Sequence, residues 1–286
     1  MSRIPRSDEL VACQSVLLEL SILFRDFWDR CVLVGGWVPY FVLGAPEGDR
    51  PVTHVGSLDL DVLVDVDAVG VDGYTAAAKV MGKRGYAPGE SAFERVREVG
   101  PPVLNRIVPV RVHLLAPQSE GTGSPRRRLQ GGLQLMALPG ADFAMEHRVE
   151  HRLEGRLPTG ETHACSLQVA DEVACFVMKG SIVPRFDASG QKDKDCYDLF
   201  TLLRRYPGGP EAFAQALSRH KDTREVQAAL ENVREQFGEP SRVGFQWTVR
   251  YLARLREAAS PQEVEEIRNE VAYVFDRFLA AIEPGG

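Results

Sequence analysis

The spacing of apolar residues predicts how the first part of the chain folds. Apolar residues recur at helical spacing over residues 7–30, and Ser7 or Asp8 is placed to cap that helix. A short apolar run over residues 31–36 predicts a buried strand that ends on two glycines. Residues 37–44 then predict a brief helix.

The next segments alternate between strand and helix. Every second position is apolar over residues 54–67, which predicts a half-buried strand, and residues 73–86 predict a helix. Two further alternating segments, 91–100 and 106–117, are separated by a Pro-Pro pair and suit adjacent strands of one sheet. This order of elements is typical of an α/β (α+β) fold.

The pattern becomes helical in the second half of the chain. The basic run "SPRRRLQGG" lies in a predicted loop over residues 118–132, and residues 145–169 predict further short strands. From residue 170 onward the apolar spacing predicts six helices, over residues 171–183, 193–206, 209–220, 224–237, 245–258 and 261–282. We therefore predict a mixed sheet flanked by helices over residues 1–165, followed by a helical region over residues 166–286.

One predicted strand, "HVGSLDLDVLVDVD", carries carboxylates at every second position. In a strand these lie on one face, opposite the apolar residues: Asp59, Asp61, Asp65 and Asp67. Asp59 and Asp61 would lie about 7 Å apart, so they repel unless a cation lies between them. An edge strand with a charged outer face is the alternative interpretation. An EF-hand is excluded because Gly70 and Ala76 occupy the positions of its last ligand.

Composition excludes several other classes of protein. The 286 residues are 44% hydrophobic and 26% charged, which is typical of a globular protein. No apolar stretch is long enough to span a bilayer, and the first residues lack a secretory signal, so we expect a cytoplasmic protein without a membrane partner. The five cysteines form no CxxC pair, and the charge of −6 argues against a broadly basic, nucleic-acid-binding surface.

A glycine pair upstream of the aspartates is typical of a site that binds phosphate. Gly35 and Gly36 follow the predicted strand in "VGGW". Glycines at such a position let the backbone approach a phosphate closely, and N–H groups at a helix start can hold the anion.

Two segments together resemble a known superfamily. "LVGGWVPYFVLG" followed by "GSLDLDVLV" resembles the signature of the nucleotidyltransferase fold, with a glycine pair and a Ser ahead of Asp-x-Asp. "MKGSIVPRFDASGQKDKDCYDLFTLL" resembles the second signature of the AbiEii-type nucleotidyltransferases, many of which are toxins of bacterial toxin–antitoxin pairs. The matching residues in this second segment are Lys179, Arg185, Lys194, Asp195, Tyr197 and Asp198.

The resemblance implies a role for each matching residue. Asp59 and Asp61 would hold Mg²⁺ or Mn²⁺ against the phosphates of an NTP substrate. The triphosphate would lie against a second set of residues, whose backbone or positive charge suits an anion: Gly35, Gly36, Gly56, Ser57, Lys179, Arg185 and Lys194. Asp195 and Asp198, three positions apart on one helix face, would assist the metal or accept the proton of the acceptor hydroxyl.

The chain departs from the superfamily pattern at one position. Many members carry a third carboxylate on a later strand, where this chain has His113 in "VRVHLLAP". Imidazole is a poor ligand for Mg²⁺. Three outcomes follow: His113 is a general base, Asp195 or Asp198 replaces the carboxylate, or the site is weakened or inactive.

These observations predict a metal-dependent nucleotidyltransferase. The resemblance favours RNA, especially the end of a tRNA, as the acceptor, and the toxin of a toxin–antitoxin pair as the biological role, with an antitoxin protein as partner. A small-molecule adenylyltransferase of the antibiotic-modifying type is the enzymatic alternative. A non-catalytic nucleotide-binding or partner-binding module with a degenerate site is the alternative from another class.

Overall fold

Contacts between residues divide the chain into a sheet unit and a helical unit. The computed structural model describes residues 4–43, 56–117, 126–128, 134–183, 193–258 and 260–282. The sheet unit comprises Pro5–Val42 and Val55–Asp171, and the helical unit contains Glu172–Gly286. The two units therefore meet in sequence after residue 171, beyond the expected boundary at residue 165, because the last strand of the sheet continues to Ala170.

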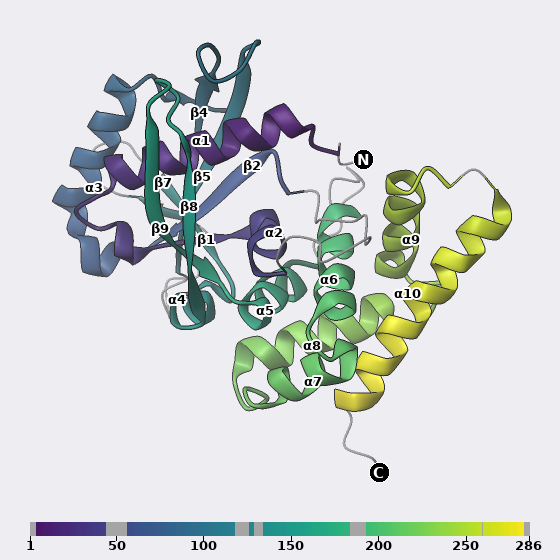
Figure 1. The fold of residues 1–286 in the computed structure, drawn as a ribbon. Helices are drawn as coiled ribbons and strands as arrows, with labels where there is room; N and C mark the ends of the chain where they lie inside the picture. Colours follow the sequence, from purple (N-terminus) through teal and green to yellow (C-terminus); the bar gives the residue numbers. More distant parts are fainter. Residues whose placement is uncertain are drawn as a thin grey trace. The chain divides into compact units, whose positions relative to one another are not determined.

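A single mixed sheet forms the centre of the sheet unit (Figure 1). The described residues contribute nine strands: β1 (Cys31–Val34), β2 (Asp59–Val64), β3 (Ala87–Pro88), β4 (Glu94–Val99), β5 (Val108–Pro117), β6 (Arg126–Arg128), β7 (Gln134–Leu138), β8 (Arg148–Arg156) and β9 (Thr162–Ala170). The main path of the sheet runs β3-β4-β5-β2-β1-β9-β8.

Both parallel and antiparallel pairs occur in this sheet. β2 pairs antiparallel with β1 and parallel with β5, and β1 pairs parallel with β9. Along the edge opposite β2, β5 is long enough to pair with two strands. Its first half pairs antiparallel with β4 and its last residues pair parallel with β7. The predicted α/β class with a mixed sheet is confirmed.

Helices of the sheet unit pack against the strands. They are α1 (Ser7–Leu23), the 3₁₀ turns η1 (Trp28–Arg30) and η2 (Gly35–Trp37), α2 (Val38–Val42), α3 (Val66–Lys83) and α4 (Ala141–Glu146). α1 lies across the strands and contacts β4, β5, β2, β9 and β8 (Figure 1). Its Val16, Leu17 and Leu20 are fully buried. Arg97 on β4 donates to Glu19 of α1 at 2.9 Å, which fixes the helix on the sheet.

The helical unit contains the six helices that the apolar spacing predicted. They are α5 (Glu172–Ile182), α6 (Asp193–Arg205), α7 (Gly209–Ser218), α8 (Arg224–Phe237), α9 (Val243–Leu255) and α10 (Pro261–Ile282). Phe176, Phe213 and Phe278 form an aromatic cluster with ring centroids 5.2 to 6.1 Å apart. Among the described helices of both units, none combines the length and the apolar character that a membrane span requires.

The aspartate strand is shorter than its alternation predicted. β2 ends at Val64, and α3 begins at Val66, with the carbonyl of Asp65 accepting from the N–H of Val69. Aspartate is favoured at such a helix start, so the alternation of polar and apolar residues continues past the end of the strand. Only Asp59 and Asp61 of the four aspartates are strand residues.

Two further predictions for the sheet unit are wrong. The edge-strand interpretation fails because β2 lies between β1 and β5 in the sheet. The predicted loop over 118–132 contains a strand, since Arg126–Arg128 pairs antiparallel with β7. Three consecutive arginines carry no apolar alternation, so their strand state depends on the partner strand and not on local sequence.

Candidate functional site

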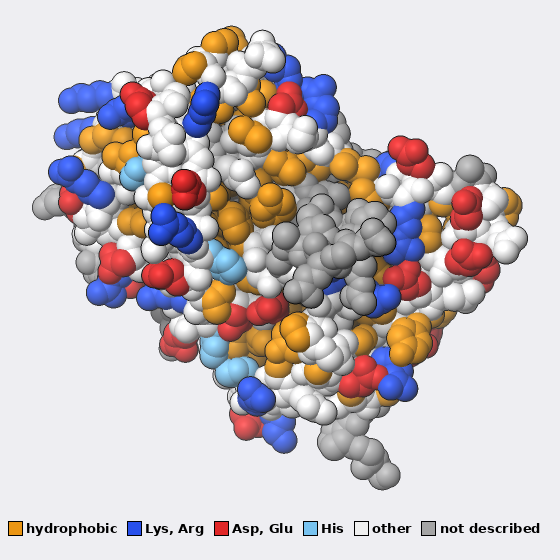
Figure 2. Space-filling model, in the orientation of Figure 1, with side chains coloured by type: hydrophobic (Ala, Val, Ile, Leu, Met, Phe, Trp, Pro, Cys, Tyr) orange, Lys and Arg blue, Asp and Glu red, His pale blue; other side chains and the backbone are white. Residues whose placement is uncertain are grey.

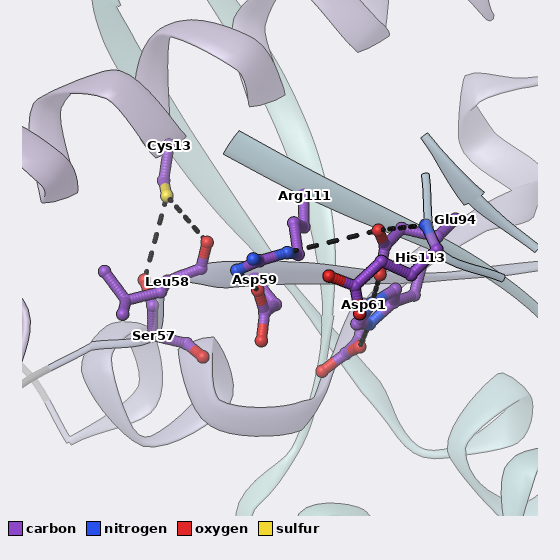
Figure 3. A network of polar contacts seen from close by, with 9 residues as sticks. Cys13, Ser57, Leu58, Asp59, Asp61, Glu94, Arg111 and His113 are labelled. Atoms are coloured by element: carbon purple, nitrogen blue, oxygen red, sulfur yellow. Dashed lines mark hydrogen bonds and ion pairs between the residues drawn. The ribbon is translucent and has the colours of Figure 1, made fainter. Parts of the chain in front are cut away.

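Two carboxylates project from the middle of the sheet. Leu60, Val62 and Val64 are buried, which places Asp59 and Asp61 together on the other face of β2. The parallel register with β5 sets Asp59 beside Arg111 and Asp61 beside His113 (Figure 3). Carboxylates on a central strand cannot be explained by protection of a sheet edge.

Gly35 lies directly against the carboxylate of Asp61. Val34, the last residue of β1, is in register with Asp61, and the chain turns into η2 at Gly35. Gly35 has φ +73°, and a Cβ there would lie 2.1 Å from Asp61 Oδ2. Only glycine satisfies both the left-handed backbone and this close approach.

His113 joins two carboxylates from neighbouring strands. Its Nδ1 lies 2.9 Å from Asp61 Oδ1, and its Nε2 lies 3.2 Å from Glu94 Oε2 (Figure 3). Glu94 is the first residue of β4 and is in register with His113. Its other carboxylate oxygen accepts from the backbone N–H of Glu90 at 3.0 Å, so the carboxylate is held in place.

The surrounding carboxylates keep His113 protonated. Burial alone would lower the pKa of His113, but the hydrogen bond to Asp61 and the negative charge of Asp61 and Asp59 act in the opposite direction. Together with the hydrogen bond to Glu94 they raise the pKa from 6.5 to about 9. At neutral pH both ring N–H groups therefore donate to carboxylates. The protonated His113 is therefore a cation at the position where the superfamily pattern has a third carboxylate.

Asp59 has one carboxylate oxygen to which no described residue donates a hydrogen bond. Burial, followed by the charge of Asp61, raises the pKa of Asp59. Among the described residues its Oδ1 is buried without a hydrogen-bond partner, and it forms a long ion pair with Arg111 Nη1 at 3.8 Å. A buried carboxylate oxygen without a partner costs free energy. The cost is removed if a cation binds there.

The donor set fits a two-carboxylate magnesium or manganese site. Mg²⁺ commonly takes one or two protein carboxylates and completes its shell with water and substrate phosphates. Over the described residues, no group of three or more His, Cys, Asp or Glu side chains is arranged to hold a metal ion. Asp59 and Asp61 alone could offer such an ion two carboxylates.

The segment before β2 also needs glycine. Gly56 has φ +69°, and a Cβ there would lie 2.6 Å from Leu10 of α1. The next two carbonyls, of Ser57 and Leu58, lie 3.7 and 3.8 Å from the Sγ of Cys13, which donates to them (Figure 3). α1 thus fixes the backbone that leads into Asp59.

The helical unit brings together four other predicted residues. Lys179 Nζ lies 2.6 Å from Asp195 Oδ1 and 2.7 Å from Asp198 Oδ2. Lys194 Nζ lies 3.0 Å from the same oxygen of Asp198. The side chain of Asp198 is 0% exposed and that of Lys179 is 4% exposed, whereas Asp195 is 26% exposed.

This ion cluster keeps Lys179 charged. Burial would lower the pKa of Lys179, but the charges of Asp195 and Asp198 raise it well above its ordinary value. Lys179 is therefore an ammonium group held by two carboxylates from the next helix. The cluster fixes α5 against the start of α6.

The predicted residues thus fall into one group in each unit. Gly35, Gly36, Gly56, Ser57, Asp59, Asp61 and His113 belong to the sheet unit, and Lys179, Lys194, Asp195 and Asp198 belong to the helical unit. Arg185 lies outside the described residues. Sequence analysis missed Glu94, because the position of Glu94 beside His113 follows from the exact register of β4 and β5, which residue spacing alone does not give.

The charged surface agrees with the low net charge. On the face in Figure 2, Lys and Arg side chains are interspersed with Asp and Glu, and no broad basic area is visible.

Comparison with known proteins gives one structural likeness. No protein-family model matches the chain, and no curated protein matches its sequence. The chain is similar to the crystal structure of an antigenic nucleotidyltransferase-like protein from Paracoccidioides brasiliensis, with a TM-score of 0.47 and 17% sequence identity. The match covers 82% of this chain and 91% of that chain.

Proposed function

We propose that this chain is a nucleotidyltransferase that moves a nucleoside monophosphate from an NTP to a hydroxyl acceptor. One observation carries the proposal. Asp59 and Asp61 share one face of a central strand, and the backbone of Gly35 lies against Asp61 where any side chain would clash. The sequence motif that resembles the nucleotidyltransferase signature supplies these three residues.

Asp59 and Asp61 would hold Mg²⁺ or Mn²⁺. The unsatisfied Oδ1 of Asp59 supports this role. When bound, the metal supplies positive charge to the phosphates of the NTP and to the pyrophosphate leaving group.

The remaining residues of the sheet unit bind and orient the nucleotide. By the resemblance, the triphosphate would lie against the backbone of Gly35, Gly36, Gly56 and Ser57. His113 carries a proton at neutral pH, so we assign it the fixing of the Asp61 carboxylate and not the deprotonation of the acceptor. Glu94 in turn holds the second nitrogen of His113.

The resemblance assigns the other charged groups of the reaction to residues that belong to the helical unit. Of the two carboxylates suggested to accept the proton of the acceptor hydroxyl, Asp195 is accessible to solvent and Asp198 is not. We therefore assign proton transfer to Asp195 and the positioning of Lys179 to Asp198. Lys194, and Arg185 by the resemblance, would add positive charge for the triphosphate.

RNA, especially the end of a tRNA, is the acceptor that the AbiEii-type resemblance favours. The same resemblance suggests a toxin that an antitoxin protein restrains. Both assignments rest on that sequence motif and extend the proposed transfer reaction.

The proposal is tested by incubating the protein with each α-labelled NTP, Mg²⁺ or Mn²⁺, and total cellular RNA. Asp59→Ala and Asp61→Ala should each lower the transfer of label at least about a hundredfold, because the charge that the metal supplies amounts to several kcal/mol. Asp26→Ala is the matched control, since its carboxylate is 86% exposed and lies outside β2. Equal labelling by all four proteins would refute the assignment.

The acceptor class follows from the same assay. Label that enters RNA identifies the RNA acceptor, and label that remains on the protein identifies self-modification. If neither is labelled, small hydroxyl compounds of the antibiotic type are the next acceptors to test.

The protonated His113 favours a second candidate function, a nucleotide-binding module without catalysis. In such a module the imidazolium would neutralise the carboxylates permanently. His113→Asp distinguishes the two functions. A strong gain of transfer indicates a degenerate site, whereas no gain or a loss indicates a working site that uses His113 or a carboxylate of the helical unit.

A further inference from the structure

Strand β8 forms one end of the main sheet path, and no described strand pairs with its outer hydrogen-bonding edge. Over the described residues it pairs with β9 alone. The N–H of Leu157 donates to Glu161 and the N–H of Asp171 donates to His147. Hydrogen-bonded pairs alternate along an antiparallel ladder, so the odd-numbered residues of β8 direct their backbone groups toward β9. The even-numbered residues direct their N–H and C=O groups outward.

The side chains of these even-numbered residues alternate in charge. They share one face of β8, and their signs run plus, minus, plus, minus, plus: Arg148, Glu150, Arg152, Glu154 and Arg156. The last four are exposed. Among the described residues the set contains one ion pair, Arg152 with Glu154 at 3.7 Å along the same strand.

Strand β9 does not neutralise this pattern. The β9 residues in register with the five charged residues are all uncharged: Ala170, Gln168, Ser166, Ala164 and Thr162. The alternation therefore does not serve cross-strand pairing inside the chain. It is suited to a strand that carries the complementary order of charges.

We propose that the complementary strand is β8 of a second copy of this chain, paired antiparallel with His151 on the two-fold axis. In this register Arg148 lies opposite Glu154 of the partner copy, and Glu150 lies opposite Arg152 of the partner copy. Symmetry makes each pair occur twice, so four opposite-charge pairs form. The two sheets join into one continuous sheet.

Charge excludes the register centred on Arg152. There Arg148 would face Arg156 and Glu150 would face Glu154, and like charges directly opposite each other are destabilising.

Apolar contacts favour the register centred on His151 over the other register that pairs opposite charges. Centring on His151 sets Val149, which is 39% exposed, opposite Leu153 of the other copy. A register centred on Leu153 also pairs opposite charges, but it sets His151 opposite Gly155 and does not pair Val149 with Leu153. The odd-numbered face contacts the helices of the sheet unit, since Gly155 approaches Leu18 of α1. Burial lowers the pKa of His151, so the two imidazoles on the axis are neutral at pH 7 and do not repel.

Charge reversal tests the proposal by light scattering over a range of protein concentrations. The wild-type protein should be a dimer that weakens at high salt. Glu150→Arg alone or Arg152→Glu alone should raise the dimer dissociation constant about tenfold or more, because each creates two like-charge pairs. Glu235→Arg, an exposed position on α8, makes the same change of charge and should leave the dimer intact.

Restoring the charge order tests the register itself. The double variant Glu150→Arg with Arg152→Glu should dimerise again, and a mixture of the two single variants should form a heterodimer. In the Leu153-centred register the double variant would set its new arginine opposite Arg156 and its new glutamate opposite Glu154, so it would remain weakened.

A cross-link gives an independent measurement. His151→Cys places two thiols at a non-hydrogen-bonded pair on the axis, where Cα atoms lie about 4.5 Å apart, within the range of a disulfide. Mild oxidation should link this variant into a covalent dimer. Val149→Cys, which has no symmetric counterpart opposite it, should not cross-link.

Three results would overturn the proposal. A wild-type protein that stays monomeric at tens of micromolar would show that the charges only keep the edge unpaired. A dimer that Glu150→Arg and Arg152→Glu leave unchanged would use another surface. A double variant that remains weakened would exclude the His151 axis. None of these results depends on transferase activity.

Discussion

His113 contacts carboxylates on both sides and is fully charged at neutral pH. A metal-free sample followed by NMR should show its imidazole titrating near pH 9. Asp61→Asn removes the first hydrogen-bond partner and much of the negative charge, so the midpoint should fall toward 6.5. A wild-type midpoint at or below 6.5 would contradict the network of Asp61, His113 and Glu94.

The same pKa makes stability depend on pH. Because folding raises the pKa of His113 from 6.5 to about 9, its contribution is complete below pH 6.5 and is lost as the pH rises through about 9. The contribution is at most about 3 kcal/mol. The free energy of unfolding, measured with denaturant, should decrease less between pH 6 and pH 9.5 for His113→Asn than for the wild type.

Gly35 and Gly82 form a matched pair for substitution by alanine. Gly35→Ala combines a positive φ with a clash against Asp61, so we expect a loss of about 1 to 3 kcal/mol in the free energy of unfolding. At Gly82, on α3, an added Cβ meets nothing within 4 Å. Alanine there should raise stability slightly, by less than about 1 kcal/mol. Equal effects in chemical denaturation would show that Asp61 does not lie against Gly35.

At the scale of the element, the ion cluster determines how firmly α5 and α6 are joined. Lys179→Met leaves Asp198 buried with one ammonium group fewer, and the expected loss in the free energy of unfolding is about 2 to 4 kcal/mol. Lys179→Met with Asp198→Asn should recover part of this loss, because the buried charge is removed together with its partner. If the loss of the double variant in thermal unfolding equals the sum of the losses of Lys179→Met and Asp198→Asn, the two side chains do not interact.

The elements also show how far the sequence could predict the fold. Periodicity predicted α1, β1, β4, β5 and all six helices of the second unit, because each buries an apolar face of regular spacing. It overextended β2, since Asp65 and Asp67 continue the alternation after the strand has ended. It could not predict the position of β2 inside the sheet, because β2 pairs with β5 about fifty residues further along the chain. It could not predict β6 either, because three arginines carry no apolar alternation and their strand state depends on pairing with β7.

Within the candidate site, motifs predicted the residue types but not their contacts. The expectation that Gly35 lets a phosphate approach the backbone remains a prediction, whereas the contact of Gly35 with Asp61 and its positive φ were not predicted. The partnership of His113 with Glu94 required the register of β4 and β5. The expectation that Lys179 faces the triphosphate remains a prediction, although the structure already gives Lys179 two carboxylate partners.

At the scale of the whole molecule, net charge governs solubility. The chain carries a formal charge of −6 at pH 7 and has a pI of about 5.6. Repulsion between molecules therefore decreases as the pH falls toward that value. Solubility measured between pH 5 and 8 should reach its minimum near pH 5.6 and rise on both sides. A minimum above pH 7 would show that large pKa shifts dominate the charge.

The parallel pairing of β1 with β9 has a consequence for how the sheet is made during synthesis. Leu33 pairs with Val169, so the two strands are separated by most of the sheet unit. Contacts over such separations form late in folding. A ribosome must therefore extend the chain past Ala170 before β1 gains its second neighbour. Until then the unpaired edge of β1 is open to chaperones and to other nascent chains. Truncation before Thr162 should therefore yield aggregated protein.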